Sequence, residues 1–322
     1  MKPICKIWQM LLALSLCITA SFSQAADFPS RVIKFVVPMG PGSGLDSNAR
    51  FIAEKAAILL GQPIIVENHP GGSTIIGTEY VLKAPADGYT VLLISPSSMI
   101  INPIMRKDIS YDAQRDILPI SGMNRSGTVL VVPNNSPYKS LQDVVTASKA
   151  KPGSVSVANY SDYYRFGSAL LGKELGVTFT DVSFKGASEV LTSVSGGHVD
   201  IGLTAFGAAA PLVSSGKLRA LAVTTKERAD APEYREVPTI QESGHPGFEQ
   251  FVWTGFGVKA GTPAPIVKKL EQAISTVVAG AEFRNFLKAQ GGEVPFTATG
   301  IELAELVRSD TERYKNILEM VK

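Results

Sequence analysis

The chain has 322 residues, of which 45% are hydrophobic and 19% are charged, and its formal net charge is +2. This length suits two α/β lobes, each large enough to bury a core of its own. A net charge so close to zero provides no basic field for nucleic acid or for an anionic membrane surface, so we expect neither as a partner.

The N-terminus has the pattern of an export signal. Two lysines precede an apolar run over residues 10–20, and residues 23–25 (Ser-Gln-Ala) have the form of an A-x-A-like cleavage site. The run is shorter than the roughly 20 apolar residues that a membrane span needs. We therefore interpret residues 1–25 as a signal peptide that is cleaved near Ala25/Ala26, and we expect a periplasmic protein.

The sequence offers little for covalent or metal chemistry. Its two cysteines, Cys5 and Cys17, both lie in the predicted leader, so the mature chain has no disulfide, no thiol nucleophile and no Cys-ligated metal. His69, His198 and His245 are scattered, and none has another His or a Cys three or four residues away. We predict no catalytic residue, no metal site and no cofactor.

Strand and helix patterns alternate along the chain, which is typical of α/β lobes with mainly parallel sheets. In order, we predict a strand at 32–37, a helix at 47–60, strands at 64–68 and 90–94 on either side of a helix at 75–83, and a β-rich stretch at 117–132 interrupted at 124–127. There follow helices at 140–150, 166–175 and 187–195, strands at 154–158, 181–183, 199–203 and 220–223, a β-like segment at 248–258, and helices at 265–279, 282–289 and 301–321.

This order predicts two crossings between lobes, near residues 125 and 250. We therefore expect lobe one to comprise residues 26–124 and 250–322, and lobe two residues 125–249. The C-terminal helices would return to lobe one, and two crossing strands would form the hinge of a clamp.

The first strand and the first helix are joined by residues 38–46, which we call the first loop. Backbone N–H groups at a helix start lack intrahelical partners and carry the positive end of the helix dipole. The three glycines of the loop would let an anion approach that backbone closely. On local grounds an anion cradle and a plain turn are equally supported. Asp46 is placed to cap the helix, and the loop has neither a G-x-G-x-x-G nor a Walker pattern.

Several segments together resemble the Bug family, also called TctC, the extracytoplasmic solute-binding receptors of tripartite tricarboxylate transport systems. The matching segments are residues 36–50 (VVPMGPGSGLDSNAR), 61–71 (GQPIIVENHPG), 84–90 (APADGYT), 184–186 (FKG), 216–223 (GKLRALAV) and 237–244 (VPTIQESG). The family usually has Arg where His69 stands.

The resemblance implies a two-lobe periplasmic-binding-protein fold, with mixed, mainly parallel sheets flanked by helices, that closes on a small carboxylate. Two loops would act as pincers: the first loop and residues 159–165, which we call the second loop. The second loop departs from the family, because Asn-Tyr-Ser-Asp-Tyr-Tyr-Arg stands where a small Gly/Ser-rich loop ending in His is typical. Thr204 likewise stands where an Asp is common.

The candidate ligand-binding residues are Pro38, Gly40, Gly42, Ser43, Gly44 and Asp46 in the first loop, Ser97 and Ser98 after the strand at 90–94, Ser161, Asp162, Tyr164 and Arg165 in the second loop, and Thr204.

Some of these residues have a second interpretation. The Arg165 guanidinium could pair with a ligand carboxylate, or with Asp162 three residues earlier. The tyrosines of the second loop could grip a ring or a hydrocarbon stem, or they could fill space and narrow the cleft. The hydroxyl groups of Ser97, Ser98 and Thr204 could donate to a ligand or only to nearby turns.

We therefore expect a monomeric receptor that delivers a small organic acid to membrane permease subunits. A dicarboxylate, a tricarboxylate, an amino acid and an aromatic acid all remain open as ligands. One alternative is a secreted α/β hydrolase that uses Ser97 or Ser98, although the chain lacks a G-x-S-x-G elbow. Another is a ligand sensor that docks on a signalling receptor through the same cleft.

Overall fold

The computed structural model describes residues 28–290 and 293–321. The predicted signal peptide and its cleavage site at Ala25/Ala26 lie outside the described residues, as do both cysteines. Within the described part, no helix combines the length and apolar character that a membrane crossing requires.

Lobe one is built on three parallel strands, β1 (Ile33–Val37), β2 (Ile64–Asn68) and β3 (Thr90–Ile94). The central strand is β1, which pairs with both of the others. The remaining elements of this half are α2 (Gly44–Leu60), η1 (Gly72–Thr74), α3 (Ile75–Lys83), η2 (Ser97–Ile101), α4 (Asn102–Met105) and α5 (Ala113–Asp116).

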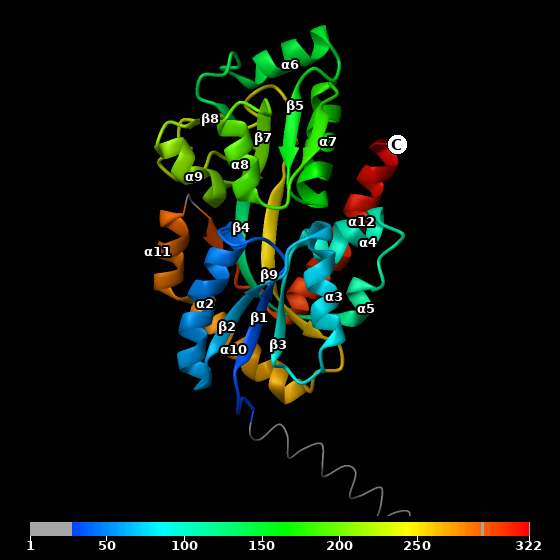
Figure 1. Cartoon of the computed structure of the whole chain (residues 1–322), viewed down its shortest axis with the longest axis vertical. Helices are drawn as coiled ribbons and strands as arrows, with labels where there is room; N and C mark the ends of the chain where they lie inside the picture. Colours follow the sequence, from blue (N-terminus) through cyan, green and yellow to red (C-terminus); the bar gives the residue numbers. More distant parts are fainter. Residues whose placement is uncertain (1–27, 291–292, 322) are drawn as a thin grey trace, which may run out of the picture.

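Two long strands, β4 (Ile117–Pro133) and β9 (Phe251–Lys259), run between the lobes (Figure 1). They pair with each other in antiparallel register as far as Gly127 and Phe251, and β9 also joins β3 of lobe one. From Thr128 onward β4 pairs instead with two strands of lobe two, β7 (Ile201–Ala205) and β8 (Leu218–Val223). The exact lobe boundaries near residues 125 and 250 stay a prediction.

The predicted interruption of the β-rich stretch at 124–127 is wrong, because β4 continues through these residues. Asn124 and Ser126 are polar but buried, and Asn124 bonds to Thr254 and Glu293 instead of turning to solvent. Its pairing register with β9 shifts next to Ser121 and again next to Asn124, so the strand continues without a break.

Lobe two places β5 (Ser156–Asn159) in parallel between β6 (Thr180–Ser183) and β7 (Ile201–Ala205), with β8 (Leu218–Val223) on β4. Its helices are α6 (Leu141–Ala150), α7 (Asp162–Leu175), α8 (Ala187–Ser195) and α9 (Phe206–Ser214). The sequence did not predict α9, and the predicted start of α7 at residue 166 is wrong by one turn.

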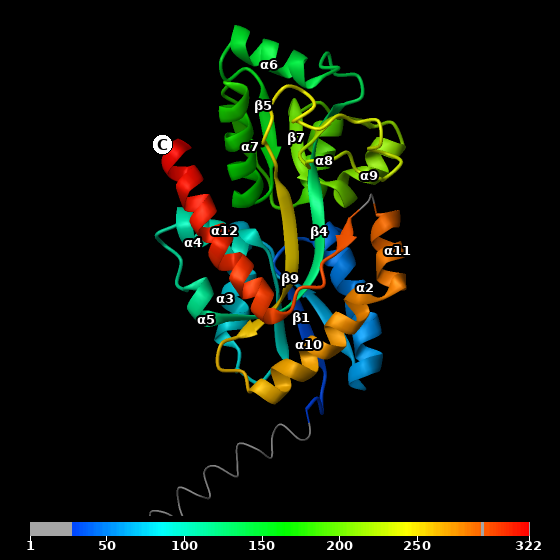
Figure 2. The same ribbon diagram turned by 180° about the vertical axis from the view of Figure 1, so that it is seen from behind.

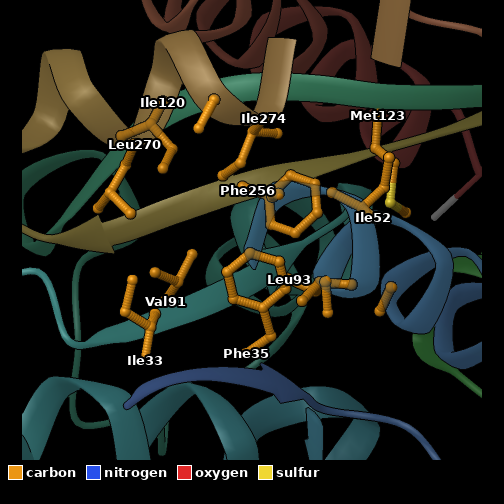
Figure 3. Close-up of a cluster of buried hydrophobic side chains, with 14 of the residues drawn as sticks. Ile33, Phe35, Ile52, Val91, Leu93, Ile120, Met123, Phe256, Leu270 and Ile274 are labelled. Atoms are coloured by element: carbon orange, nitrogen blue, oxygen red, sulfur yellow. The ribbon is translucent and has the colours of Figure 1, made fainter. Parts of the chain in front are cut away.

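The C-terminal elements, α10 (Ala264–Ala279), α11 (Ala281–Ala289), β10 (Val294–Pro295) and α12 (Gly300–Val321), return to lobe one. Figure 3 shows the result: Leu270 and Ile274 of α10 pack with Phe35 and Phe256 in one core. The rings of Phe35 and Phe256 lie 5.0 Å apart between centroids.

The final helix, α12, lies across the back of the molecule, beside β9, and points toward lobe two (Figure 2). Its Tyr314 ring packs against Tyr163 and Phe166 of α7, and its Asp310 accepts a hydrogen bond from Trp253 Nε1 at 3.2 Å. One helix therefore contacts both the crossing strand and lobe two.

Candidate functional site

A small cavity of about 40 Å³ lies between the lobes, at the carboxyl ends of β1, β3, β5 and β7. This edge is where open α/β sheets bind ligands. The lining residues are Met39, Ser43, Gly44, Leu45, Asn48, Ser95, Ser97, Asn124, Ser126, Tyr160, Tyr163, Tyr164, Ala205, Val252, Thr254 and Glu293.

A larger hollow of about 270 Å³ is open on the surface of lobe one, beside Glu79, Tyr111 and Lys259. It contains none of the predicted site residues and lies away from the junction of the lobes. We therefore take the smaller cavity, at the junction of the lobes, as the candidate site.

The start of α2 forms one wall of the cavity. Ser43 is the N-cap, and its Oγ accepts the Asp46 N–H at 3.2 Å. The N–H groups of Gly44 and Leu45 belong to the first turn, where no intrahelical acceptor exists, and both residues line the cavity. This wall therefore offers backbone donors at the positive end of a 17-residue helix.

The prediction that Asp46 caps a helix starting at residue 47 is wrong, because Ser43 takes that role three residues earlier. Asp46 lies inside the first turn and accepts hydrogen bonds from the Gly42 N–H and from Asn68 Nδ2, besides pairing with Arg50 at 2.9 Å. Burial acts to raise the pKa of Asp46, but the hydrogen bonds from Arg50, Gly42 and Asn68 outweigh it and lower that pKa. Its charge is balanced within the protein.

The other candidate residues of the first loop do not line the cavity. Pro38 is buried against Gly77, where an added Cβ would lie 2.7 Å from the proline Cβ. Gly40 is not among the lining residues, and Gly42 has a φ of 77° and gives its N–H to Asp46. Of the six candidates in this loop, Ser43 and Gly44 face the cavity.

Among the polar residues after β3, too, some line the cavity and one forms only local hydrogen bonds. Ser97 lines the cavity and donates to Ser161 Oγ at 3.2 Å, which joins lobe one to lobe two. Ser98 closes a turn, because its Oγ donates to the Ser95 carbonyl and accepts the Ser95 N–H. The buried hydroxyl of Ser95, which the sequence did not single out, lines the cavity without a hydrogen-bond partner.

Asp162 and Arg165 of the second loop do not line the cavity. Asp162 lies 2.7 Å from Arg106 Nε and accepts its hydrogen bond across the lobe junction, and its N–H donates to Ser73 Oγ. Arg165 Nη1 lies 3.8 Å from Asp162 and Arg165 Nε lies 3.7 Å from Asp181, while its side chain is 51% exposed. The structure thus favours internal ion pairs for both residues.

Three tyrosines fill the lobe-two side of the cavity. The rings of Tyr160 and Tyr164 lie 4.3 Å apart between centroids, and Tyr163 meets Tyr164 edge-on. Burial raises the pKa of Tyr160 and of Tyr164, so both keep a neutral hydroxyl group at physiological pH. Thr204 is buried behind Tyr160 and does not line the cavity.

The sequence also did not indicate Glu293, which follows α11 and lines the cavity from the far end of the chain. Its Oε2 accepts from Asn48 Nδ2 at 3.0 Å and from Asn124 Nδ2 at 2.6 Å. Burial raises the pKa of Glu293, against the opposing effect of hydrogen bonds from Asn48, the Gly207 N–H and Ser126. Only Asn48 carries a local signal, because it lies one helical turn after Gly44 on the same face.

Among residues 28–290 and 293–321, no group of three or more His, Cys, Asp or Glu side chains is arranged to hold a metal ion. Beside apolar side chains and tyrosine rings, the polar groups of the lining are backbone groups, hydroxyls, amides and one carboxyl group. Such a set can bind and orient a small polar solute.

Comparison with known proteins gives a consistent result. Residues 48–322 match the family described as the tripartite tricarboxylate transporter family receptor, TctC. A UPF0065 protein from the tcbD-tcbE intergenic region of Pseudomonas sp. strain P51 is 32% identical over 311 residues, covering 95% of this chain and 91% of its own. Another UPF0065 protein, from Bordetella pertussis, is 30% identical and covers 100% of this chain and 98% of its own.

Solved structures agree with the fold. The R. palustris protein solved with adipate has a TM-score of 0.87 at 28% identity, covering 92% of this chain and 98% of its own. Periplasmic binding protein BugD has a TM-score of 0.86 at 26% identity, covering 91% and 98%. MatC from Rhodopseudomonas palustris, solved with malate, has a TM-score of 0.85 at 28% identity, covering 92% and 100%.

The predicted two-lobe periplasmic-binding-protein fold is therefore confirmed. The chain belongs to the TctC, or Bug, family of tripartite tricarboxylate transporter receptors, whose members are solute-binding proteins and not enzymes.

Proposed function

We propose that this protein is a periplasmic receptor that captures a small carboxylate between its two lobes and delivers it to a tripartite tricarboxylate-type transporter. The observation that carries the proposal is the wall at the start of α2, where Gly44 and Leu45, whose N–H groups have no intrahelical acceptor, line the cavity between the lobes. The hydroxyl groups of Ser95 and Ser97 lie in the same lining. Helix N-termini with free N–H groups are suited to bind anions.

The relatives support this class of ligand. One related structure contains adipate and another contains malate, and both cover more than nine-tenths of this chain. Both ligands are small carboxylates without a basic group. A carboxylate in this cavity would be held by many modest hydrogen bonds, strengthened when closure removes water.

Entry of the solute requires the lobes to part. A cavity of about 40 Å³ has room for only about two or three water-sized spheres, and hydrogen bonds between Ser97 and Ser161 and between Arg106 and Asp162 cross the junction. We infer that β4 and β9 flex where they pass between the lobes, as in other proteins that close on a ligand. The closed form would then be the one that the membrane permease subunits recognise.

A thermal-shift screen tests the proposal. Mature protein would be unfolded, freed of bound solute and refolded, then melted with linear mono- and dicarboxylates of three to six carbons, citrate, amino acids and aromatic acids. A solute that binds only the folded state at 100 times its Kd stabilises it by about 2.7 kcal/mol. We expect at least one carboxylate to raise Tm and its uncharged amide to leave Tm unchanged.

Two results would contradict the proposal. If no carboxylate in the panel shifts Tm or gives heat in calorimetry, the cavity is not a carboxylate site. If a bound acid is recovered chemically altered, the hydrolase alternative gains over the receptor. Recovery of the unchanged acid together with a saturable calorimetric isotherm is the result that the proposal requires.

A further inference from the structure

The carboxyl group of Glu293 occupies an unusual position for a receptor of acids. It extends from the segment after α11 into the junction of the lobes, where it meets Asn48 of α2 and Asn124 of β4. A Cβ atom added to Gly207, at the start of α9, would lie 2.7 Å from Glu293 Oε1. The carboxyl group therefore lies among α2, β4 and the start of α9, and Glu293 is 5% exposed.

No cation balances this group in the part of the chain that the structure describes. The lining of the cavity includes Glu293 but no Lys, Arg or His, and no ion pair of Glu293 is found among those residues. Neutral amides and one hydroxyl group are its hydrogen-bond donors, with the Gly207 N–H. A buried carboxylate without a cationic partner is destabilised by its loss of hydration.

A second hydrogen-bond acceptor in the lining, the Oδ1 atom of Asn48, has no donor. Asn48 is 1% exposed, and although its Nδ2 donates to Glu293, its Oδ1 is buried without any hydrogen bond. Asn48 Oδ1 accepts hydrogen bonds and cannot donate them. Glu293 and Asn48 together therefore form an acceptor group in the cavity, suited to a solute that brings N–H donors.

We propose, given the carboxylate-receptor function above, that Glu293 determines the charge specificity of this protein by selecting a solute that carries an ammonium group beside its carboxylate. The ammonium would lie against Glu293 and Asn48 Oδ1, while the carboxylate would accept from the N–H groups at the start of α2. The solute class is an α-amino carboxylate.

The spacing within the cavity supports the α position. A Cβ atom on Gly44, at the donor wall, would lie only 3.6 Å from Glu293 Oε1. The donor wall and the acceptor group are therefore adjacent, so that one small solute must present its anion and its cation close together. A second carboxylate in place of the ammonium would face Glu293 directly, and like charges at such a distance repel strongly in a dry cavity.

Matched solutes test this proposal by calorimetry. Propanoate and alanine differ by one ammonium group, as do succinate and aspartate, and glutarate and glutamate. We expect the wild-type protein to prefer the amino member of at least one pair, by at least about tenfold, as for buried charge pairs at interfaces. β-Alanine, whose ammonium is one carbon farther from the carboxylate, should bind more weakly than alanine.

Three variants test whether Glu293 causes the preference for the amino member of each pair. Glu293→Gln keeps the shape of the side chain but removes its charge, and should abolish the preference within each pair. Glu293→Asp keeps the charge and should retain part of it. Glu305→Gln, on the exposed side of α12, is the matched control and should leave every affinity unchanged. Circular dichroism would check that each variant is folded.

The outcomes separate this proposal from the broader one. Binding of the plain acids as tightly as their amino counterparts, or an unchanged preference in folded Glu293→Gln, would overturn the role of Glu293 while leaving the carboxylate receptor intact. A preference for dicarboxylates that weakens as pH rises would overturn it too, because Glu293 would then donate as a carboxylic acid. If an acid of the wider panel binds but none of the amino carboxylates does, the role of Glu293 is overturned, and only silence of the whole panel makes the proposed function itself fail.

Discussion

The two loops predicted to hold the ligand are built differently. In the first loop, Ser43 and Gly44 lie where a strand gives way to a long helix, and they contribute backbone groups to the cavity. In the second loop, Asp162 and Arg165 carry charged side chains that engage other residues of the protein. Only the tyrosines of that region reach the cavity, where they occupy space.

The two loops differ in how far along the chain the residues lie that determine their geometry. A strand, a glycine-rich loop and a helix in succession place free N–H groups at one point regardless of what the rest of the chain does. The partner of a charged side chain is set by tertiary packing, and that of Asp162 is Arg106, 56 residues earlier in the chain. Substitutions at the start of α2 should therefore change binding of the solute, whereas substitutions in the second loop should change how firmly the two lobes are held together.

The largest effect is expected for Gly44→Leu, which would fill the cavity at the first loop. The first position of a helix accepts any side chain without strain, so the fold should persist. The added side chain should crowd the bound solute at a cost of about 1–3 kcal/mol. In binding free energy this is a loss of affinity of roughly ten- to a hundredfold. Calorimetry with the solute found in the screen would measure it, and a full affinity in a folded variant would show that the solute binds elsewhere.

At the second loop, Arg106→Ala should weaken the closed form and leave the cavity intact. The Asp162 side chain is 7% exposed, and an unpaired buried acceptor costs about 1–3 kcal/mol. The radius of gyration from small-angle scattering should rise in the absence of solute, and the affinity should fall because closure is less favourable.

Arg165→Ala is the matched control, because its ion pairs are long and half exposed. We expect a change of at most about 0.5 kcal/mol in stability or binding. If Arg165→Ala reduced affinity more than Arg106→Ala while Tm stayed constant, Arg165 would have to contact the solute.

Substitution of Ser43 tests whether this residue, and not Asp46, caps the start of α2. Ser43→Ala removes the side chain that accepts the Asp46 N–H, and loss of an N-cap lowers the free energy of unfolding by about 1 kcal/mol. Denaturant unfolding would measure the change. Ser43→Asp, which restores an acceptor at the same position, should recover most of the loss; no recovery would mean that the hydroxyl group matters for another reason.

A smaller and purely pH-dependent effect is expected from Glu293. Its pKa is raised by burial above the ordinary value of 4.5, so between the two values the folded protein binds more protons than the unfolded chain. The free energy of unfolding must then fall as pH rises through that interval. The difference between wild type and Glu293→Gln, followed by denaturant unfolding from pH 4.5 upward, should show this slope, and parallel curves would contradict it.

Much of the fold follows from patterns that are local. Residues 64–68 and 90–94 contain the apolar runs Ile-Ile-Val and Val-Leu-Leu-Ile, lie between turn residues, and form strands β2 and β3 with the predicted bounds. The helices at 75–83 and 187–195 also form as predicted. The missed helix α9 has a glycine at its second position and Pro211 in its interior, and both argue against a helix by propensity. Burial of its alanines against lobe two overrides them.

The site is less predictable because its key contacts join distant segments. Glu293 bonds to Asn48 across 245 residues and to Asn124 across 169, and nothing near residue 293 indicates a cavity. Asn124 and Ser126 look like turn residues in the sequence, yet they lie inside a buried strand. Gly44 could be predicted as a donor because its position depends only on the strand and helix beside it.

The most direct test is a crystal structure of the protein with the solute that raises its Tm. We expect the carboxylate of that solute within hydrogen-bond distance of the Gly44 N–H, with its ammonium against Glu293 and with Arg165 pointing to Asp162 or Asp181. A carboxylate held by Arg165, or a solute bound outside the cavity at the start of α2, would contradict this account.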